Sequence, residues 1–186
     1  MNGSELGQVP PIPHGEERRG PATTFCAREA PVVIAAGTGS VRRIFTIALP
    51  SGLRLLNANK PLHYRRRAQI TKELRSAAMA AVSENRSLQA ALAEVTPAPL
   101  FLRAHVLGVL HPTTGGRRDP ANWYPSFKAA VDGIVDAGVL EDDDHTRLVG
   151  PDMRIGAVVK GGQIVLRILE LAPGEQWPDF GAGVAA

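Results

Sequence analysis

A nearly continuous apolar run at residues 100–110 (LFLRAHVLGVL) constrains the fold of this chain more than any other stretch. It is too short to cross a membrane, which takes about 18 apolar residues, and no other run of the chain comes closer to that length. Strands that are covered on both faces have such sequences, because neither face meets water. The run therefore predicts a buried central strand, and His105 within it is expected to be a packed sheet histidine rather than a ligand.

Strand and helix patterns precede this run. Residues 41–49 are rich in β-branched and aromatic side chains and are followed by Pro50, which predicts a strand. Residues 62–93 are mostly good helix formers with apolar residues at helical spacing. They predict a long amphipathic helix with a break near Asn85.

A second helix and further strands are predicted after the run. Asp119, or Asn122 in its place, is a suitable N-cap, and Gly138 is the expected terminator. Residues 146–149 fit a short extended segment. A β-hairpin is expected near the end, with its strands at residues 158–160 and 163–171 around a Gly161-Gly162 turn.

This order of elements predicts an α+β domain over residues 41–171, with a small mixed β-sheet of about four strands packed with two main helices. Residues 1–40 are rich in Pro and Gly, lack apolar periodicity and are predicted to be a disordered tail. Residues 172–186 are expected to be a flexible C-terminal tail. The chain has one cysteine and no signal-peptide pattern, which favours a cytoplasmic protein.

Basic residues are concentrated in one segment, although the net charge is only +3. Between residues 54 and 75 the single acid is Glu73. A segment of this kind suits a polyanion, with nucleic acid as the first candidate, and a solvated helix face is the alternative. The basic residues are Arg54, Lys60, Arg65, Arg66, Arg67, Lys72 and Arg75.

The chemistry is concentrated in residues 115–151, where Asp119 follows a basic pair, Lys128 lies on the predicted helix, and residues 141–144 are all acidic. Carboxylates at both ends of a short helix, with a lysine between them, can place metal ligands and a cation around one phosphate. Taken singly, each has an ordinary role as a helix cap, a surface lysine or a solvated turn. Trp123 either stacks on bases or packs in the core, and core packing is favoured.

Taken in this order, the residues resemble the RusA family of Holliday-junction resolvases, small endonucleases common in phages and prophages. That family carries Arg-Arg-Asp-x-Asp-Asn, then a helix with a lysine, then Ala-Gly and Asp-Asp pairs, and a strand hairpin. The similarity spans about residues 41–171 and is most specific between 117 and 143. The matching residues are Arg117, Arg118, Asp119, Asn122, Lys128, Asp132, Ala137, Gly138, Asp142, Asp143, Gly161 and Gly162, with Leu49, Pro50 and Asn59 before them.

The resemblance implies a homodimeric, Mg²⁺-dependent endonuclease, with Mn²⁺ as a possible substitute, that resolves four-way DNA junctions by paired nicks. It carries catalytic roles over to Asp119, Lys128 and Asp143. Metal binding is carried over to Asp119 and Asp143, with the neighbouring Asp142 as a further ligand. Contacts to DNA are expected from Arg65, Arg66, Arg67, Arg117, Arg118 and Asn122.

The chain departs from the family pattern at two places. The second Asp of the family motif is Ala121 here, and three extra residues lie between Asn122 and Lys128. Because Mg²⁺ requires oxygen ligands, the change at position 121 leaves open a branched-DNA-binding protein with weak or lost cleavage. A protein that acts through protein contacts alone is a third possibility.

Overall fold

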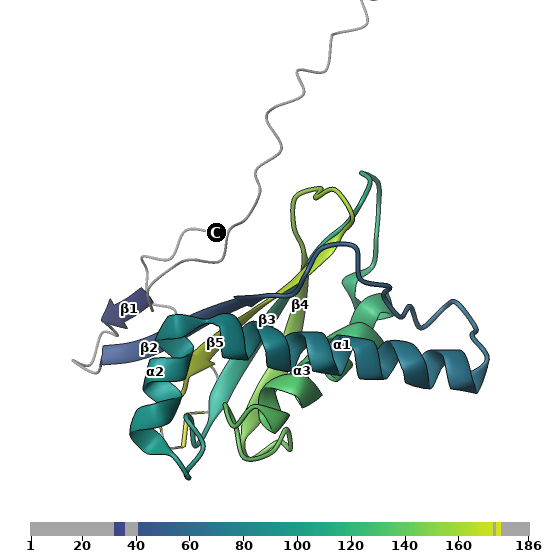
Figure 1. Ribbon diagram of the computed structural model, residues 1–186. Coiled ribbons are helices and arrows are strands. Elements are labelled where there is room, and N and C mark those ends of the chain that lie inside the picture. The colour runs from purple at the N-terminus through teal and green to yellow at the C-terminus, as the bar shows by residue number, and fades with distance from the viewer. Residues whose placement is uncertain (1–31, 36–40, 173, 176–186) are drawn as a thin grey trace, which may run out of the picture.

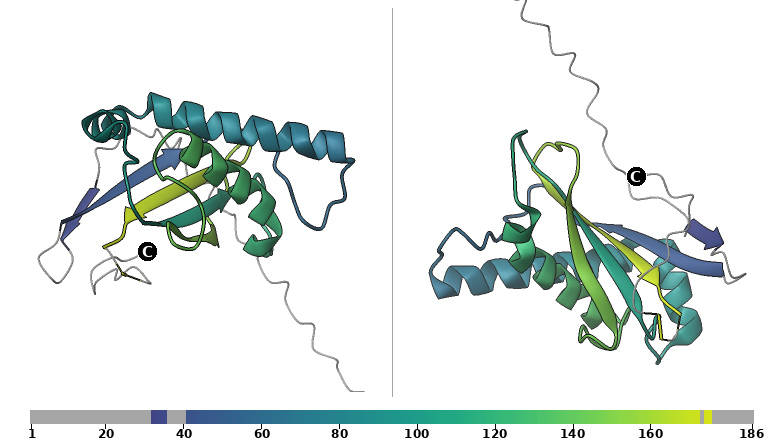
Figure 2. Two further views of the ribbon diagram at one scale, coloured as in Figure 1. Left: turned by 90° about the horizontal axis from the view of Figure 1, so that it is seen from below. Right: turned by 180° about the vertical axis from the view of Figure 1, so that it is seen from behind.

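The computed structural model describes residues 32–35, 41–172 and 174–175, which form a five-stranded sheet with helices on one face (Figures 1 and 2). Neighbouring strands are antiparallel except for the last pair, β3 and β4, which are parallel. The predicted α+β class with a small mixed sheet is confirmed. In sheet order the strands are β1 (Val32–Ala35), β2 (Val41–Ala48), β5 (Gln163–Glu170), β3 (Ala104–His111) and β4 (Leu148–Ile155).

The predicted long helix is two helices, α1 (Tyr64–Glu84) and α2 (Arg86–Val95), and they meet at Asn85 as expected. The Asn85 side chain accepts a hydrogen bond from Leu88 N–H (3.1 Å) and so caps α2. Its amide group also donates to the carbonyl of Thr46 in β2 (3.2 Å). One polar residue therefore ends the first helix, starts the second and ties both to the sheet.

The parallel pair β3 and β4 requires a crossover, because parallel strands cannot be joined by a tight turn. A short 3₁₀ helix, η1 (Pro120–Trp123), and the helix α3 (Tyr124–Asp136) supply it. In both views of Figure 2, α3 lies on the same face of the sheet as α1. The crossover thus packs α3 against α1, with Gly133 next to Arg75 and Ala78.

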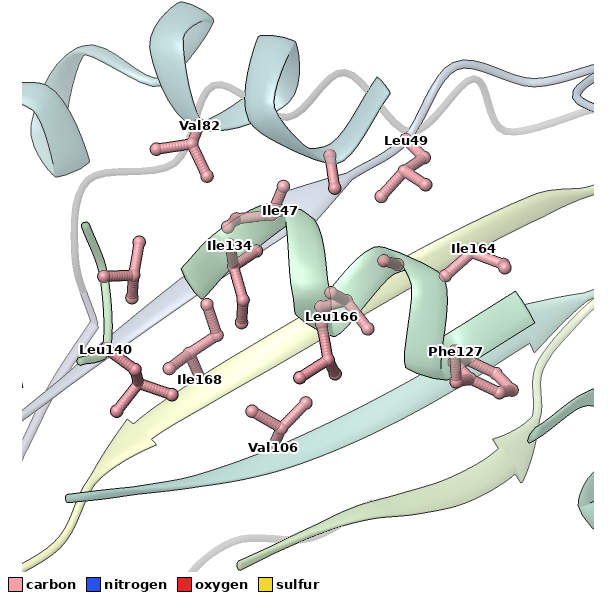
Figure 3. Close-up of a cluster of buried hydrophobic side chains, with 14 of the residues drawn as sticks. Ile47, Leu49, Val82, Val106, Phe127, Ile134, Leu140, Ile164, Leu166 and Ile168 are labelled. Carbon is pink, nitrogen blue, oxygen red and sulfur yellow. The ribbon is translucent and has the colours of Figure 1, made fainter. Parts of the chain in front are cut away.

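The core lies between this sheet face and the helices (Figure 3). Alternate residues of the strands point into it, such as Phe45 and Ile47 of β2, and Leu166 and Ile168 of β5. His105, on the other face of β3, is 2% exposed, and its Nε2 lies 2.8 Å from Asp152 Oδ2. It is the packed sheet histidine that was predicted.

The predicted hairpin is wrong, because residues 158–160 do not form a strand. Val159 N–H donates to the carbonyl of Pro112 (2.9 Å) in the loop after β3, so it joins no strand ladder. The Gly161-Gly162 turn leads into β5, which enters the sheet between β2 and β3. The prediction paired segments that are neighbours in the sequence. β5 instead pairs with β2 and β3, which lie far from it in the sequence.

Two further strand boundaries differ from the expectation. The extended segment expected at residues 146–149 is the start of the longer strand β4. Within the predicted tail, residues 32–35 form β1 and pair with β2. The remaining residues of that tail, with residues 173 and 176–186, lie outside the described part of the chain. No helix in the described part has the length and apolar content that a bilayer span needs.

Candidate active site

Asp119 and Pro120 start the crossover, as the sequence predicted, but they start a 3₁₀ turn rather than α3 itself. The Asp119 side chain accepts a hydrogen bond from Ala121 N–H (2.9 Å), which caps η1. The other predicted cap, Asn122, makes a different contact, since its Oδ1 accepts from Asn59 Nδ2 (2.9 Å). The carbonyl of Asn122 also accepts from Ala58 N–H (2.7 Å). These contacts hold η1 against the loop that precedes α1.

A buried serine holds the same loop to α3. Ser126 is fully buried, and its hydroxyl accepts a hydrogen bond from Leu56 N–H (2.6 Å) and donates to Leu56 C=O (2.9 Å). A loop backbone inside a protein needs such partners, because unpaired buried amides are costly. Through this contact the loop that leads to α1 is fixed against the start of α3.

The end of α3 explains how the acidic run reaches this region. Gly138 has φ +81°, its N–H donates to Val135 C=O (2.8 Å), and Val139 N–H donates to Ile134 C=O (3.1 Å). This pair of bonds is a Schellman C-cap, which needs a residue that tolerates positive φ. The chain then turns back along α3, with Val139 and Leu140 buried. Asp143 is thereby placed opposite the second turn of the helix.

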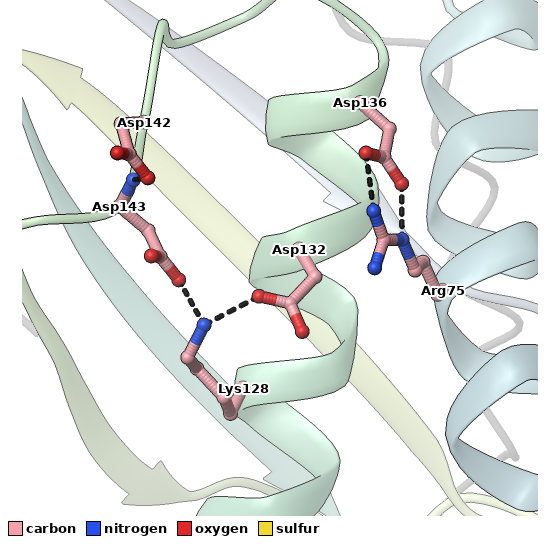
Figure 4. Close-up of polar contacts among 6 residues, drawn as sticks. All are labelled: Arg75, Lys128, Asp132, Asp136, Asp142 and Asp143. Atoms are coloured by element: carbon pink, nitrogen blue, oxygen red, sulfur yellow. Dashed lines mark hydrogen bonds and ion pairs between the residues drawn. The ribbon is translucent and has the colours of Figure 1, made fainter. Parts of the chain in front are cut away.

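Lys128 lies at the centre of the resulting cluster (Figure 4). Its Nζ is 2.5 Å from Asp132 Oδ1, one turn along the helix, and it also contacts Asp143 Oδ2. The side chains of Asp132 and Asp143 are only 25% and 22% exposed, and that of Lys128 is 41% exposed. The structure therefore holds one ammonium between two half-buried carboxylates.

The charge of this ammonium is stabilised by its partners. Partial burial acts to lower the pKa of Lys128, but the hydrogen bonds from its ammonium to Asp132 and Asp143 and their negative charges outweigh that effect. The net pKa of Lys128 is raised above its ordinary value. Lys128 is accordingly a cation at neutral pH, not a base.

The other acids of the run have partners of their own. Asp142 Oδ1 accepts from Asp143 N–H (2.7 Å), and Glu141 pairs with Arg147 (2.5 Å). Asp144 accepts from Thr146 N–H (2.6 Å), and the hydrogen bonds from Thr146 are the main cause of its lowered pKa. Within the run, Asp143 is thus the residue that contacts Lys128.

The predicted metal-ligand set of Asp119, Asp142 and Asp143 is not assembled. Within the described residues, no three His, Cys, Asp or Glu side chains are grouped so that they could hold one metal ion. Asp119 caps η1, Asp142 binds the backbone of the run, and Ala121 offers no side-chain oxygen.

The structure brings Asp132 to Asp143 instead. Sequence reasoning matched Asp132 to the family pattern but gave it no role in the site, although its i,i+4 spacing from Lys128 was a usable signal. Mg²⁺ commonly takes one or two carboxylates from a protein and the rest of its ligands from water and phosphate. Two carboxylates that already meet on one cation fit that requirement.

The predicted DNA contacts lie in two segments: Arg65, Arg66 and Arg67 at the start of α1, which projects past α3 (Figure 1), and Arg117, Arg118 and Asn122 in η1 and the loop before it. Arg65 and Arg67 are exposed and Arg66 is half-buried; Arg65 donates to Tyr64 OH (3.0 Å), and Arg66 to Gln69 Oε1 (2.6 Å). Arg117 is exposed in the loop before η1. Arg75, by contrast, is paired with Asp136 of α3 (Figure 4), so it belongs to the helix packing.

A scan against models of known protein families finds no match to this chain. A search of curated proteins finds no relative either. A functional hypothesis for this chain therefore depends on its own residues and contacts.

Proposed function

We propose that this protein is a metal-dependent endonuclease that resolves four-way DNA junctions by paired nicks. The observation that carries the proposal is the Lys128 ammonium held between Asp132 and Asp143. With a metal ion on the two carboxylates, such a group presents positive charge to a phosphodiester, which is an anion that must be both bound and attacked. The exposed basic residues at the start of α1 support a polyanionic substrate, and the loop before them contacts η1 through Asn59 and Asn122.

Each side chain has a defined part in this proposal. Asp132 and Asp143 would hold Mg²⁺, which when bound supplies hydroxide near neutral pH and offsets charge on the leaving oxygen. Lys128 donates to a non-bridging phosphate oxygen and stabilises the negative charge that develops there. The arginines at 65–67, 117 and 118 contact flanking phosphates and position the DNA without reading its sequence.

A homodimer completes the proposal. A four-way junction has two strands to cut in related positions, and a twofold-symmetric pair of subunits presents two equal sites. The expected cytoplasmic location is part of the same proposal.

A second candidate is a protein that binds branched DNA and cuts it weakly or not at all. Two observations favour it: Ala121 carries no oxygen where the resembled family has a carboxylate, and Asp143 is already paired with Lys128. In this case Lys128 and the arginines bind phosphate, and the carboxylates only position the lysine.

A nicking assay on a synthetic four-way junction, with linear duplex as control, tests both candidates. Wild type in Mg²⁺ or Mn²⁺ is expected to make symmetric nicks, and Asp143→Asn to remove them. Glu141→Gln is the matched control, because Glu141 lies in the same run but pairs with Arg147. Junction binding without nicking, with activity gained in Ala121→Asp, would favour the second candidate. A chain that neither nicks nor prefers the junction would overturn both.

A further inference from the structure

A cavity of about 410 Å³ lies apart from the Lys128 cluster. Four segments form its walls: the loop between β2 and α1, the end of β3 with the loop after it, η1, and the glycine turn before β5. These loops thus form a second concave surface. None of Lys128, Asp132 and Asp143 lines it. Its volume is in the range of small-molecule sites, and it is large enough for one nucleotide.

The lining of the cavity combines apolar side chains with polar and cationic groups. Leu53, Leu55 and Trp123 supply apolar surface, and Trp123 also packs partly against the core. Lys60 and Arg118 contribute positive charge, and no acidic side chain of the described chain lines the cavity. A ligand that matches these walls has a flat apolar body and a negative charge.

Arg118 is oriented for such a ligand by its own loop. Its guanidinium donates to Thr114 Oγ1 (2.9 Å) and to the carbonyl of Gly116 (3.2 Å). An arginine has five N–H donors, so most of its capacity remains for an anion. The two internal bonds fix the plane of the group before any ligand arrives, which reduces the entropy lost on binding.

The wall formed by the Gly161-Gly162 turn is held by contacts of its backbone. Gly161 and Gly162 have φ of +86° and +72°, and both of their carbonyls lie within hydrogen-bonding distance of Gly52 N–H (3.2 and 3.1 Å). A Cβ on Gly162 would lie 3.3 Å from the Thr113 methyl group, so the glycine also keeps this wall close to the next loop. The glycine turn thus holds this wall of the cavity through backbone contacts.

We infer that this cavity receives one unpaired nucleotide of a DNA branch, with the base against Trp123 and the leucines and the phosphate between Lys60 and Arg118. The inference rests on the proposed function and adds a second recognition element to it. Stacking on an aromatic side chain is favourable for any base, and an unpaired nucleotide is the cheapest to take from the helix. Junctions with a free nucleotide at the branch are thus preferred over perfectly paired ones.

The two tryptophans of the chain, Trp123 and Trp177, allow a direct test. In a Trp177→Phe background, indole fluorescence reports Trp123 alone. A four-way junction with one unpaired nucleotide at the branch is titrated without divalent metal, and binding is followed in parallel by anisotropy of a labelled strand. We expect saturable quenching, with stronger binding than to a perfectly paired junction.

Two lysines, Lys60 and Lys160, provide matched variants. Because both side chains are exposed, replacing either one should leave the fold intact. Lys60→Ala should weaken the binding reported by quenching about tenfold, as loss of a charged hydrogen bond does. Lys160→Ala removes the same charge from a neighbouring position that does not line the cavity, and should change it less than about twofold. Equal effects of the two substitutions would overturn the inference.

The remaining outcomes separate this inference from the proposed function. Junction binding that leaves Trp123 unquenched, in a protein that still nicks the junction, would remove the nucleotide cavity and leave the nuclease. Absence of both binding and nicking would remove both.

Discussion

A Cβ on Gly133 would lie 2.4 Å from the carbonyl oxygen of Arg75 and 2.7 Å from the Cβ of Ala78. This close approach of α3 to α1 is possible because Gly133 has no side chain. A backbone carbonyl cannot move aside as the end of a flexible side chain can, so the two helices would have to separate.

Gly133→Ala should therefore destabilise the protein, although alanine is the better helix former. Overpacking of this kind typically costs about 1–3 kcal/mol, and the clash with backbone places the expectation at the upper end. Urea unfolding followed by circular dichroism measures the change. Gly115→Ala is the control, because a Cβ there meets nothing within 4 Å. Equal stability of the two variants would show that the helices pack less closely.

Ser126→Ala should destabilise the protein through the loop it holds. The substitution leaves the N–H and C=O of Leu56 without their partner in a buried position, which costs about 1–3 kcal/mol. Ser76→Ala is the comparison, since Ser76 is an exposed serine of α1. Amide hydrogen exchange should also show faster exchange in residues 53–60 of the Ser126 variant. Unchanged exchange there would contradict the anchoring role.

Lys128→Met should leave Asp132 and Asp143 facing each other without a cation. At neutral pH the repulsion of the two carboxylates lowers the melting temperature measured in EDTA. Millimolar Mg²⁺ should raise the melting temperature of this variant more than that of wild type, because no ammonium competes for the carboxylates and a ligand of the folded state stabilises it. The double variant Lys128→Met with Asp143→Asn is expected to lose the Mg²⁺ response. Equal Mg²⁺ responses of wild type and Lys128→Met would argue against a cation site.

The Arg75–Asp136 pair should make a pH-dependent contribution to stability. The hydrogen bond from Arg75 is the main cause of the lowered pKa of Asp136, and the charge of Arg75 adds to it. The contribution is therefore present above the ordinary aspartate value of 3.8 and is lost as the pH falls through the lowered folded-state pKa.

The variant Asp136→Asn measures the contribution of the Arg75–Asp136 pair to stability. The difference in melting temperature between wild type and the variant should be small at neutral pH, because the pair is exposed, and smaller again in high salt. The difference in melting temperature should disappear as the pH falls through the lowered pKa of Asp136. A difference that stays constant across the range would mean that the substitution acts through packing.

The three arginines at the start of α1 should set the salt dependence of DNA binding. Replacing Arg65, Arg66 and Arg67 together by alanine should reduce the slope of log K against log salt by roughly 0.9 for each phosphate that the variant no longer neutralises. The control replaces Arg86, Arg154 and Arg167, three exposed arginines outside that segment. Equal slopes for the two triple variants would mean that α1 does not contact the DNA.

Local signals predicted much of this fold. Asn85 and Gly138 are residues whose own chemistry ends a helix, and the structure has helix ends at both. The pairing of β5 with β2 and β3 had no local signal, because it depends on which apolar faces meet in three dimensions. The Gly161-Gly162 pair suggested a hairpin, whereas its positive φ values serve a turn that contacts Gly52.

The candidate site was predicted only in part, because local signals identify single residues but not all of their contacts. Lys128 and Asp143 were identified from their order in the chain, and the C-cap at Gly138 brings them together. Asp132 was left without a role, although its spacing from Lys128 pointed to contact. Asp119 was assigned as a metal ligand, but an aspartate before a helix can equally be its N-cap. In the structure Asp119 caps η1.

The place of β5 in the sheet has a consequence for how the protein is made. β2 and β3 are joined only through β5, which is the last strand of the described chain. During synthesis both earlier strands leave the ribosome with an unpaired edge, and such edges are prone to pair with other chains. Assembly of the sheet must therefore wait until about residue 170 has emerged, and a premature stop before residue 163 would release two separate strand edges and an open core.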